Sequence, residues 1–412
     1  MGSTSAPSCL DDRYDVAVVG AGYTGLSAAW RLSRTGARVV VLDRGGVGVG
    51  ASSRNAGQVL TGLKLEPATL VAKYGETRAR ELFQVSRDAI AALEGIVADE
   101  GIACELERTG HLQAAAKPAH FDAFREEQAL LDRVFAHPVS LVDAASQPRE
   151  LGAHGYHGVL VDEHSLAINP AKYVTGLGAA ARRAGAVIVE GAAVERMTRA
   201  ATGWTLRTAA GDVRAGEVLI ATNGYADAAA PALRRRLIPI GSYIITTAPL
   251  SAELAARLLP TRRMVFDSRH FLHYFRLTAD NRLLFGGRAE FSGPTLESAA
   301  RAEAILRHAM ASIFPELAGT PIDYAWSGHV AFTRDQMPHA GLLDGAFYAG
   351  GYCGHGIAMA THLGQLIARR IAGERFDHPL FDDRFAPIPL YYGRPWFLPL
   401  VGLYYRFLDW VG

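Results

Sequence analysis

The chain has 412 residues, 49% of them hydrophobic and 20% charged, and its formal net charge is +1. This length exceeds one ordinary domain, and the composition is typical of a globular protein. The near-zero charge argues against a nucleic-acid-binding protein. The three cysteines are scattered, so we expect neither a disulfide framework nor a metal site, and a cytoplasmic location fits best.

The first patterned stretch reads as a βαβ unit. An apolar run, Val16–Val19, leads into a GxGxxG motif and a helix-like segment, and a second apolar run, Val39–Leu42, ends in Asp43. Such glycines permit a tight turn, the approach of a pyrophosphate and close helix–strand packing, and the acid takes a ribose hydroxyl. The unit therefore predicts a dinucleotide site, for NAD or FAD, with glycines Gly20, Gly22 and Gly25.

A second loop of glycines and small hydroxyl residues, Gly45–Gln58, follows directly. In a plain dehydrogenase the second strand soon leads into another crossover helix. Here the chain stays polar, as if it wraps a second part of the same cofactor, and this favours FAD. The alternative is a solvated Gly/Ser loop.

The following residues alternate between two kinds of pattern. Apolar spacing predicts helices over 77–100, 120–134, 171–185 and 297–313. Strands are predicted over 105–116, 186–189, 204–208, 213–220, 238–248, 264–267, 270–277 and 282–286. A last strand over 346–349 runs into the glycine loop GGYCGHGI and a helix to about residue 371, which is again a phosphate- or ring-binding geometry.

This order indicates two interleaved domains. We expect a nucleotide-binding domain from residues 14–84, 166–224 and 326–375, and a substrate domain from 85–165 and 225–325. Residues 1–13 are small and polar and lack the pattern of a signal peptide, so a disordered arm is predicted. No stretch supplies the ~20 apolar residues of a membrane span. Residues 376–412 are expected to form a tail that packs on the body, with a membrane-surface contact as the less favoured alternative.

Several stretches together resemble the D-amino-acid-oxidase superfamily of FAD flavoproteins, and most closely its γ-glutamylputrescine-oxidase-like members. They are the opening βαβ unit, GASSRNAGQ (50–58), WSGHVAFTRDQMPHAG (326–341), GGYCGHGIAMATHLG (350–364) and PIPLYYGRPWFLPLVG (387–402). The resemblance implies an α/β fold with α+β insertions, in which a glutathione-reductase-like FAD-binding Rossmann domain is interleaved with a mixed-sheet substrate domain. It also implies oxidation of a C–N bond by hydride transfer to flavin N5, giving an imine that hydrolyses.

The resemblance also implies which residues hold FAD. The first glycine turn faces the pyrophosphate, the 50–58 loop lines the isoalloxazine, and the later glycine loop sits at the flavin pyrimidine edge. The implied set is Gly20, Gly22, Tyr23, Thr24, Gly25, Asp43, Arg44, Ser52, Ser53, Ala56, Gly57, Gln58, Val194, Gly328, Gly354, His355, Gly356 and Ile357.

The chain departs from these relatives at informative positions. Arg54 stands where some relatives link the flavin through histidine, and residues 326–341 contain no cysteine for another linkage, so we expect FAD to be non-covalent. Val330 and Ala358 replace residues that hold a substrate carboxylate in glycine and sarcosine oxidases. A buried carboxylate without a cationic partner is unfavourable, so an amine or a secondary or N-substituted amino acid is the expected substrate.

Three residues are candidate catalytic groups. Alternation along 268–276 puts Tyr274 and Arg276 on one strand face, where Tyr274 could orient the amine and Arg276 could meet a distal carboxylate. His329 could face the flavin ring. The alternatives are a surface strand and a structural histidine.

The expected partners are a small amine or amino acid and dioxygen as the oxidant. One alternative is a dehydrogenase of a cyclic or N-alkyl amino acid, pipecolate- or sarcosine-like, that passes electrons to a quinone. A second alternative is a flavin-binding subunit without catalytic activity.

Overall fold

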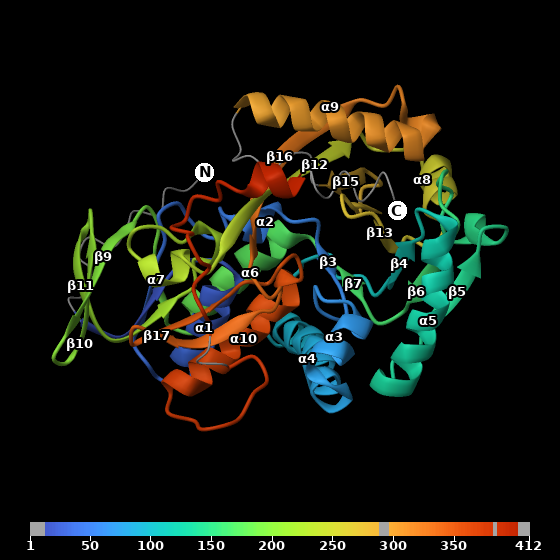
Figure 1. The fold of residues 1–412 in the computed structure, drawn as a ribbon. Coiled ribbons are helices and arrows are strands. Elements are labelled where there is room, and N and C mark those ends of the chain that lie inside the picture. Colours follow the sequence, from blue (N-terminus) through green and yellow to red (C-terminus); the bar gives the residue numbers. More distant parts are fainter. Residues whose placement is uncertain (1–12, 288–295, 382–384, 403–412) are drawn as a thin grey trace.

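Two large mixed sheets, connected by repeated crossings of the chain, form the framework of the molecule (Figure 1). The structure is a computed structural model that describes residues 13–287, 296–381 and 385–402. The expected arm at 1–13 and the last part of the tail therefore lie almost entirely outside the described residues.

The first sheet has the strand order β17-β18-β11-β1-β2-β8, with β10 and β9 continuing from β11. Its parallel centre, β11-β1-β2-β8, is buried and rich in Val and Ile because helices cover it. Its strands are β1 (Arg13–Val19), β2 (Val39–Leu42), β8 (Val187–Val189), β9 (Val194–Ala200), β10 (Gly203–Thr208), β11 (Gly211–Ile220), β17 (His339–Leu343) and β18 (Ala346–Gly350).

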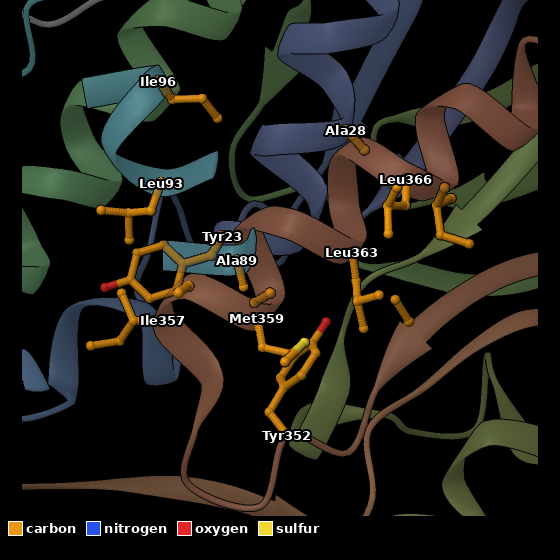
Figure 2. Packing of buried hydrophobic residues seen from close by; sticks show 14 of the residues in the cluster. Tyr23, Ala28, Ala89, Leu93, Ile96, Tyr352, Ile357, Met359, Leu363 and Leu366 are labelled. Carbon is orange, nitrogen blue, oxygen red and sulfur yellow. The ribbon is translucent and has the colours of Figure 1, made fainter. Parts of the chain in front are cut away.

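Helices α1 (Tyr23–Arg34), α6 (Pro170–Arg183), α10 (Gly356–Ile371) and α4 (Glu76–Asp99) pack with this sheet around one hydrophobic core. Figure 2 shows the point where α1, α4 and α10 meet, with Leu93 and Met359 among the side chains in contact. Two buried hydrogen bonds join α1 to the α10 region: Thr24 Oγ1 to the Tyr352 hydroxyl at 2.6 Å, and Ser27 Oγ to the Thr361 carbonyl at 2.7 Å.

The second sheet has the order β16-β12-β15-β14-β13-β4-β6-β5 and is mostly antiparallel. Helix α9 (Leu296–Ile313) lies across one end, as Figure 1 shows, and α5 (Pro118–Phe135) covers the other. The strands are β4 (His111–Ala114), β5 (Ser140–Asp143), β6 (Gly158–Asp162), β12 (Ile238–Thr247), β13 (Met264–Asp267), β14 (His273–Leu277), β15 (Leu283–Gly287) and β16 (Ile322–Phe332).

Short elements connect the two halves. A two-stranded pair, β3 (Gln58–Val59) with β7 (Leu166–Ala167), lies between the sheets. The remaining helices are α2 (Ala51–Arg54), α3 (Pro67–Tyr74), α7 (Pro231–Arg234) and α8 (Ala252–Leu258), with 3-10 turns at Gln147–Arg149, Asn223–Tyr225 and Pro315–Leu317.

The expected α/β architecture is confirmed, with two corrections to its details. The helix expected over 77–100 was predicted to lead into the substrate domain from residue 85, but the apolar face of α4 joins the core of the first sheet, because α10 supplies the complementary surface. The expected boundary at residue 326 falls inside β16, which pairs with β12 along its length and so lies wholly in the second sheet.

Candidate functional site

A cavity of about 1470 Å³ lies between the two sheets. One side is formed by the carboxyl ends of β1, β2 and β11 and the turns that follow them. The other side is the face of the second sheet that turns toward the first. Parallel sheets bind ligands beyond the carboxyl ends of their strands, so this is the expected place for a nucleotide.

The GxGxxG turn opens the cavity at the start of α1. Gly20 has φ of +110°, which an L side chain rarely adopts, and a Cβ on Gly25 would lie 2.0 Å from the Gly20 carbonyl oxygen. A Cβ on Gly22 would lie 2.9 Å from Ser52 Oγ. The N-cap residue of α1, Gly22, makes no side-chain cap, and no acidic residue stands in the first turn of the helix. The Tyr23 N–H donates to Ser52 Oγ at 3.1 Å, and the positive end of the helix dipole at this turn suits a phosphate.

Asp43 closes the second strand as expected and lines the cavity. Its Oδ2 accepts from the Ala21 N–H at 2.8 Å, and its Oδ1 accepts from the N–H groups of Gly45 and Gly46 at 2.8 and 3.1 Å. These bonds hold the carboxylate against the glycine turn. Arg44 lines the same region and forms an ion pair with Asp227.

The 50–58 loop is ordered by Asn55, a residue outside the expected cofactor set. The Asn55 amide donates to the carbonyls of Ala51 and Ser52 at 3.1 and 3.0 Å, and its Oδ1 accepts from the Gly57 N–H at 2.9 Å. Asparagine in a short turn commonly hydrogen-bonds to the neighbouring backbone, and this was the sequence signal that could have identified Asn55.

Most of the expected cofactor residues line the cavity, and three do not. Gly25, Ser53 and Gly57 lie behind the lining, where their roles are backbone geometry and packing. The lining members are Gly20, Gly22, Tyr23, Thr24, Asp43, Arg44, Ser52, Ala56, Gln58, Val194, Gly328, Gly354, His355, Gly356 and Ile357.

The start of α10 reaches the cavity from the other end of the chain. Gly354 has φ of +101° and open space where a Cβ would be, and α10 has no side-chain cap among the described residues. His355 Nδ1 is buried and has no hydrogen-bond partner within the described part of the chain. Burial lowers the pKa of His355 to about 3, so its ring is neutral at neutral pH.

The second sheet contributes an uncharged wall. We call this surface the sheet wall: the cavity-lining side chains of β12, β14 and β16. Among these described residues there is no lysine, arginine, aspartate or glutamate, and the Ser242 and Tyr274 hydroxyls, 2.8 Å apart, form a polar point. Ser242 was not predicted, although the alternation along β12 could have pointed to it. The wall includes Ile240, Ser242, Ile244, Tyr274, His329, Val330 and Phe332.

His329 lies in the sheet wall beside Tyr225, with ring centroids 5.0 Å apart. Burial and the nearby Arg54 lower its pKa. Its Nδ1 is buried and lacks a hydrogen-bond partner among the described residues. The imidazole is therefore neutral near pH 7 and has an unused ring nitrogen.

The structure does not support the expected substrate role of Arg276. Arg276 does not line the cavity, and its guanidinium donates to the carbonyls of Ala56, Ile168 and Leu277 at 2.6, 2.8 and 3.1 Å. It is 7% exposed, and burial lowers its pKa to about 10, so it remains charged. Strand alternation brought Arg276 onto the face of Tyr274, but the side chain instead joins the second sheet to the 50–58 loop.

Charged side chains line the part of the cavity around β4, β13 and α5, and we call this part the far end of the cavity. Asp267 is buried, pairs with Arg269 and His273, and has a lowered pKa because of those partners despite its burial. Lys117 and Glu127 also line this end, and burial raises the pKa of Glu127 to about 7.

A histidine cluster borders the same end. Asp162 accepts from His137 Nε2 at 2.7 Å and lies 3.2 Å from His164 Nδ1, so the three side chains have the proximity of metal ligands. Thr61 and the His164 N–H also donate to Asp162. These hydrogen bonds explain why the three side chains lie close together. The spacing of the residues in the sequence did not predict this cluster.

These features define a class of protein. Two helix starts without an N-cap side chain, an acid that follows the second strand, and glycine turns that leave the backbone open to a ligand fit a flavin dinucleotide. The neighbouring sheet wall fits a small molecule held against the flavin. The fold and site are those of an FAD-dependent oxidoreductase.

Comparison with known proteins gives the family. The model of the DAO family, described as FAD dependent oxidoreductase, matches residues 15–370, and the chain belongs to this family. The γ-glutamylputrescine oxidoreductase of Escherichia coli (strain K12) is 35% identical over 97% of this chain and 93% of its own length. The glycine oxidase of Geobacillus kaustophilus (strain HTA426) is 27% identical over 87% of this chain and 93% of its own length.

Solved structures agree on the fold. The crystal structure of glycine oxidase from Geobacillus kaustophilus superposes with a TM-score of 0.75 at 23% identity, covering 92% of this chain and 99% of that one. L-proline dehydrogenase from P. horikoshii has a TM-score of 0.73 at 18% identity, covering 90% and 96%. The protein is therefore an FAD-dependent enzyme that acts on the C–N bond of an amine or amino acid.

Proposed function

We propose that the protein oxidises an amine whose far end carries charge, and that a γ-glutamylated diamine is the first substrate to test. The similarity to a γ-glutamylputrescine oxidoreductase over nearly the whole chain supports this class. An N-substituted or cyclic amino acid held from the far end of the cavity is the second candidate.

The uncharged sheet wall is the main support for an amine. Val330 lines the wall, and Ala358 is buried in α10 outside the cavity lining, so neither position offers a cation. A carboxylate next to the reacting carbon would lie against Ile240, Ile244 and Val330, and no side chain of the wall itself would pair with its charge, which is unfavourable. Arg54, the cation beside the wall, donates to the Ser327 carbonyl at 3.3 Å. A neutral amine fits this wall without that penalty.

The charged far end supports a substrate with a remote polar group. Lys117 and Arg269 line the cavity there and suit a carboxylate, while Glu127 suits an ammonium group. A glutamyl group carries both. The long cavity thus separates the reacting amine from the group that identifies the substrate.

Three cavity-lining side chains, those of Tyr274, Ser242 and His329, have proposed roles in the reaction. FAD, when bound, supplies the two-electron acceptor for the hydride that leaves the carbon next to nitrogen. The Tyr274 and Ser242 hydroxyls orient the amine against the wall, and neutral His329 accepts the proton that the substrate ammonium must lose before hydride can leave. Water then hydrolyses the imine to a carbonyl compound and free amine or ammonia.

We further propose that FAD is held without a covalent bond. The side chain at position 54 is arginine, and residues 326–341 contain no cysteine, so neither linkage of the relatives can form there. Denaturing the protein with acid should release all flavin into the supernatant. Flavin that stays with the precipitated chain would contradict this.

An anaerobic flavin-reduction screen tests the substrate. We expect γ-glutamylputrescine to remove the visible flavin absorbance, and glycine, sarcosine and pipecolate to react at least tenfold more slowly. Tyr274→Phe should slow reduction by about tenfold, the effect of one lost hydrogen bond of ~1.4 kcal/mol. Failure of every amine and amino acid in the screen would overturn the proposal.

The same reduced sample identifies the electron acceptor. Fast return of the flavin absorbance on admitting air identifies an oxidase, as first expected. A reduced flavin that persists in air and is reoxidised by a soluble quinone analogue identifies a dehydrogenase.

A further inference from the structure

The C-terminal strap, which we define as residues 385–402, is fixed to the turn that follows α7. The Ile388 N–H donates to the Arg235 carbonyl at 2.9 Å, and the Tyr391 hydroxyl donates to the Leu237 carbonyl at 2.8 Å. Arg236 Nε donates to the Phe385 carbonyl at 2.6 Å. In Figure 1 the strap is the red segment that runs beside α7 and ends in a short helical turn near β12 and β16.

The inner side of the strap forms part of the cavity. Ile388, Phe397, Leu398 and Val401 are among the lining residues. Leu398 is 4% exposed, so this side is packed against the body as a wall. The strap therefore belongs to the enclosure of the site and is not a loose tail.

The outer side of the strap is apolar and exposed. Leu390 is 77% exposed, Tyr392 68%, and Trp396 and Leu400 64% each. The other large hydrophobic side chains that are exposed in the described ranges, Val49, Ile305, Tyr324 and Leu342, lie scattered in other elements. Single exposed apolar side chains are normal on a surface that faces only water, but four within one short segment indicate an interaction site.

Arginines accompany this outer side. Arg235 lies over the Tyr392 ring with its guanidinium carbon 5.0 Å from the centroid, and Arg234 packs against Gly393. Arg394 is exposed in the strap itself. Within the described part of the chain, none of these three arginines forms an ion pair with a carboxylate. The chain as a whole is nearly neutral, so this is a local excess of positive charge.

We propose that the outer side of the strap is a docking surface for an anionic lipid bilayer. Tryptophan and tyrosine favour the boundary between lipid headgroups and acyl chains, leucines enter the apolar layer beneath, and arginines bind anionic headgroups. No helix in the described ranges is long and apolar enough to span a membrane, so the contact is with one leaflet. Bilayer docking brings the wall formed by Phe397 and Val401 next to lipid, and so places the cavity beside the membrane.

Vesicle sedimentation with the FAD-loaded full-length enzyme tests the surface. We expect wild type to sediment with phosphatidylcholine vesicles that contain phosphatidylglycerol, and to remain in the supernatant with pure phosphatidylcholine. Trp396→Ser combined with Leu400→Ser should weaken binding by at least tenfold. Arg235→Gln and Arg394→Gln should each weaken it by about fivefold, and high salt should have the same effect.

A matched variant separates this surface from general stickiness. Tyr324→Ser combined with Leu342→Ser removes two other exposed apolar side chains, 59% and 51% exposed, and should leave vesicle binding unchanged. Flavin content and thermal unfolding must match wild type in every variant, and a variant that fails this check is replaced by the arginine substitutions. The proposal is overturned if wild type does not bind anionic vesicles, or if the two double variants bind these vesicles equally well. A strap double variant that only converts a dimer to a monomer, without any vesicle binding by wild type, would assign the surface to a second copy of the chain instead.

Discussion

The two sheets position their functional residues in different ways. The first sheet places them through short contiguous motifs: the glycines that start α1, the acid that ends β2 and the glycines that start α10 each act within a few residues of a strand end. The second sheet places them through register, because the hydroxyls of Ser242 in β12 and Tyr274 in β14 meet only when distant strands pair, and the pairing of β16 with β12 sets His329 opposite Gly241. Local geometry thus makes the cofactor half, and long-range pairing makes the substrate half.

The halves are not independent, and Arg276 shows how they are joined. It is anchored in the second sheet and satisfies backbone carbonyls of the 50–58 loop and of the segment after β7. Gln58 works in the opposite direction, since its amide donates to the carbonyls of Val265 and Phe275 at 3.2 and 3.3 Å. The position of the sheet wall over the cofactor half therefore depends on a few buried polar side chains. The following four experiments test this comparison.

Gly25→Ala should have the largest effect. The new Cβ would lie 2.0 Å from the Gly20 carbonyl, so the turn and α1 must separate, and we expect loss of bound FAD with destabilisation of about 3 kcal/mol. Flavin absorbance per chain and urea unfolding measure this. Gly95→Ala in α4 is the matched control, because a Cβ there meets nothing within 4 Å and should stabilise the helix slightly. Normal FAD binding by Gly25→Ala would show that the cofactor half tolerates local change.

Arg276→Met should destabilise the junction of the halves by about 3 kcal/mol, because three buried carbonyls lose their donors. Urea unfolding measures the loss. Arg196→Met, at an exposed position in β9, should change the free energy of unfolding by less than about 0.5 kcal/mol. If Arg276→Met instead keeps full stability and raises only KM, then Arg276 binds substrate after all.

His329→Asn should slow anaerobic flavin reduction by about 100-fold without loss of FAD, since it removes the proposed proton acceptor of the sheet wall. The lowered pKa of His329 means that the neutral ring dominates at pH 7, and that the wild-type reduction rate falls only as acid protonates it. Stopped-flow absorbance from pH 5 to 9 measures both effects. His308→Asn, exposed in α9, is the control and should behave as wild type. An unchanged rate for His329→Asn would assign that histidine a structural role.

Acid should titrate His355 of the cofactor half and Asp162 of the substrate half in different pH ranges, and this is the smallest effect. The unfolded chain protonates histidine near pH 6.5, but His355 in the folded protein resists until about pH 3, so its contribution is lost as the pH falls through that range. Asp162 has a lowered pKa because of His137, so its contribution is lost only below about pH 4. Each slope is at most about 1.4 kcal/mol per pH unit.

Unfolding of the FAD-loaded enzyme across this pH series tests the separation. His355→Gln should make the decline between pH 6.5 and 4 less steep, whereas Asp162→Asn should leave that part unchanged and make the decline below it less steep. Equal effects of the two substitutions in one range would contradict the separate titration of His355 and Asp162.

By itself the sequence determined the cofactor half. The GxGxxG spacing, Asp43 and the GHG loop are short-range signals, because each depends on backbone geometry within a few residues, and their expected placement at one cavity agrees with the structure. Apolar spacing also predicted the longer helices and many of the strands, but it missed strands β5, β6, β16 and β17 and helices α3 and α8.

Only the tertiary structure decided the substrate half. Alternation placed Tyr274 and Arg276 on one face, but it could not say that Arg276 turns to backbone carbonyls, because those of Ala56 and Ile168 belong to segments far away in the chain. Ser242 and the charged far end have no local motif, since their roles come from neighbours brought close by sheet register, whereas Asn55 acts within its own turn. A glycine turn carries its geometry in its own residues, whereas a cavity wall acquires its chemistry only after distant strands pair.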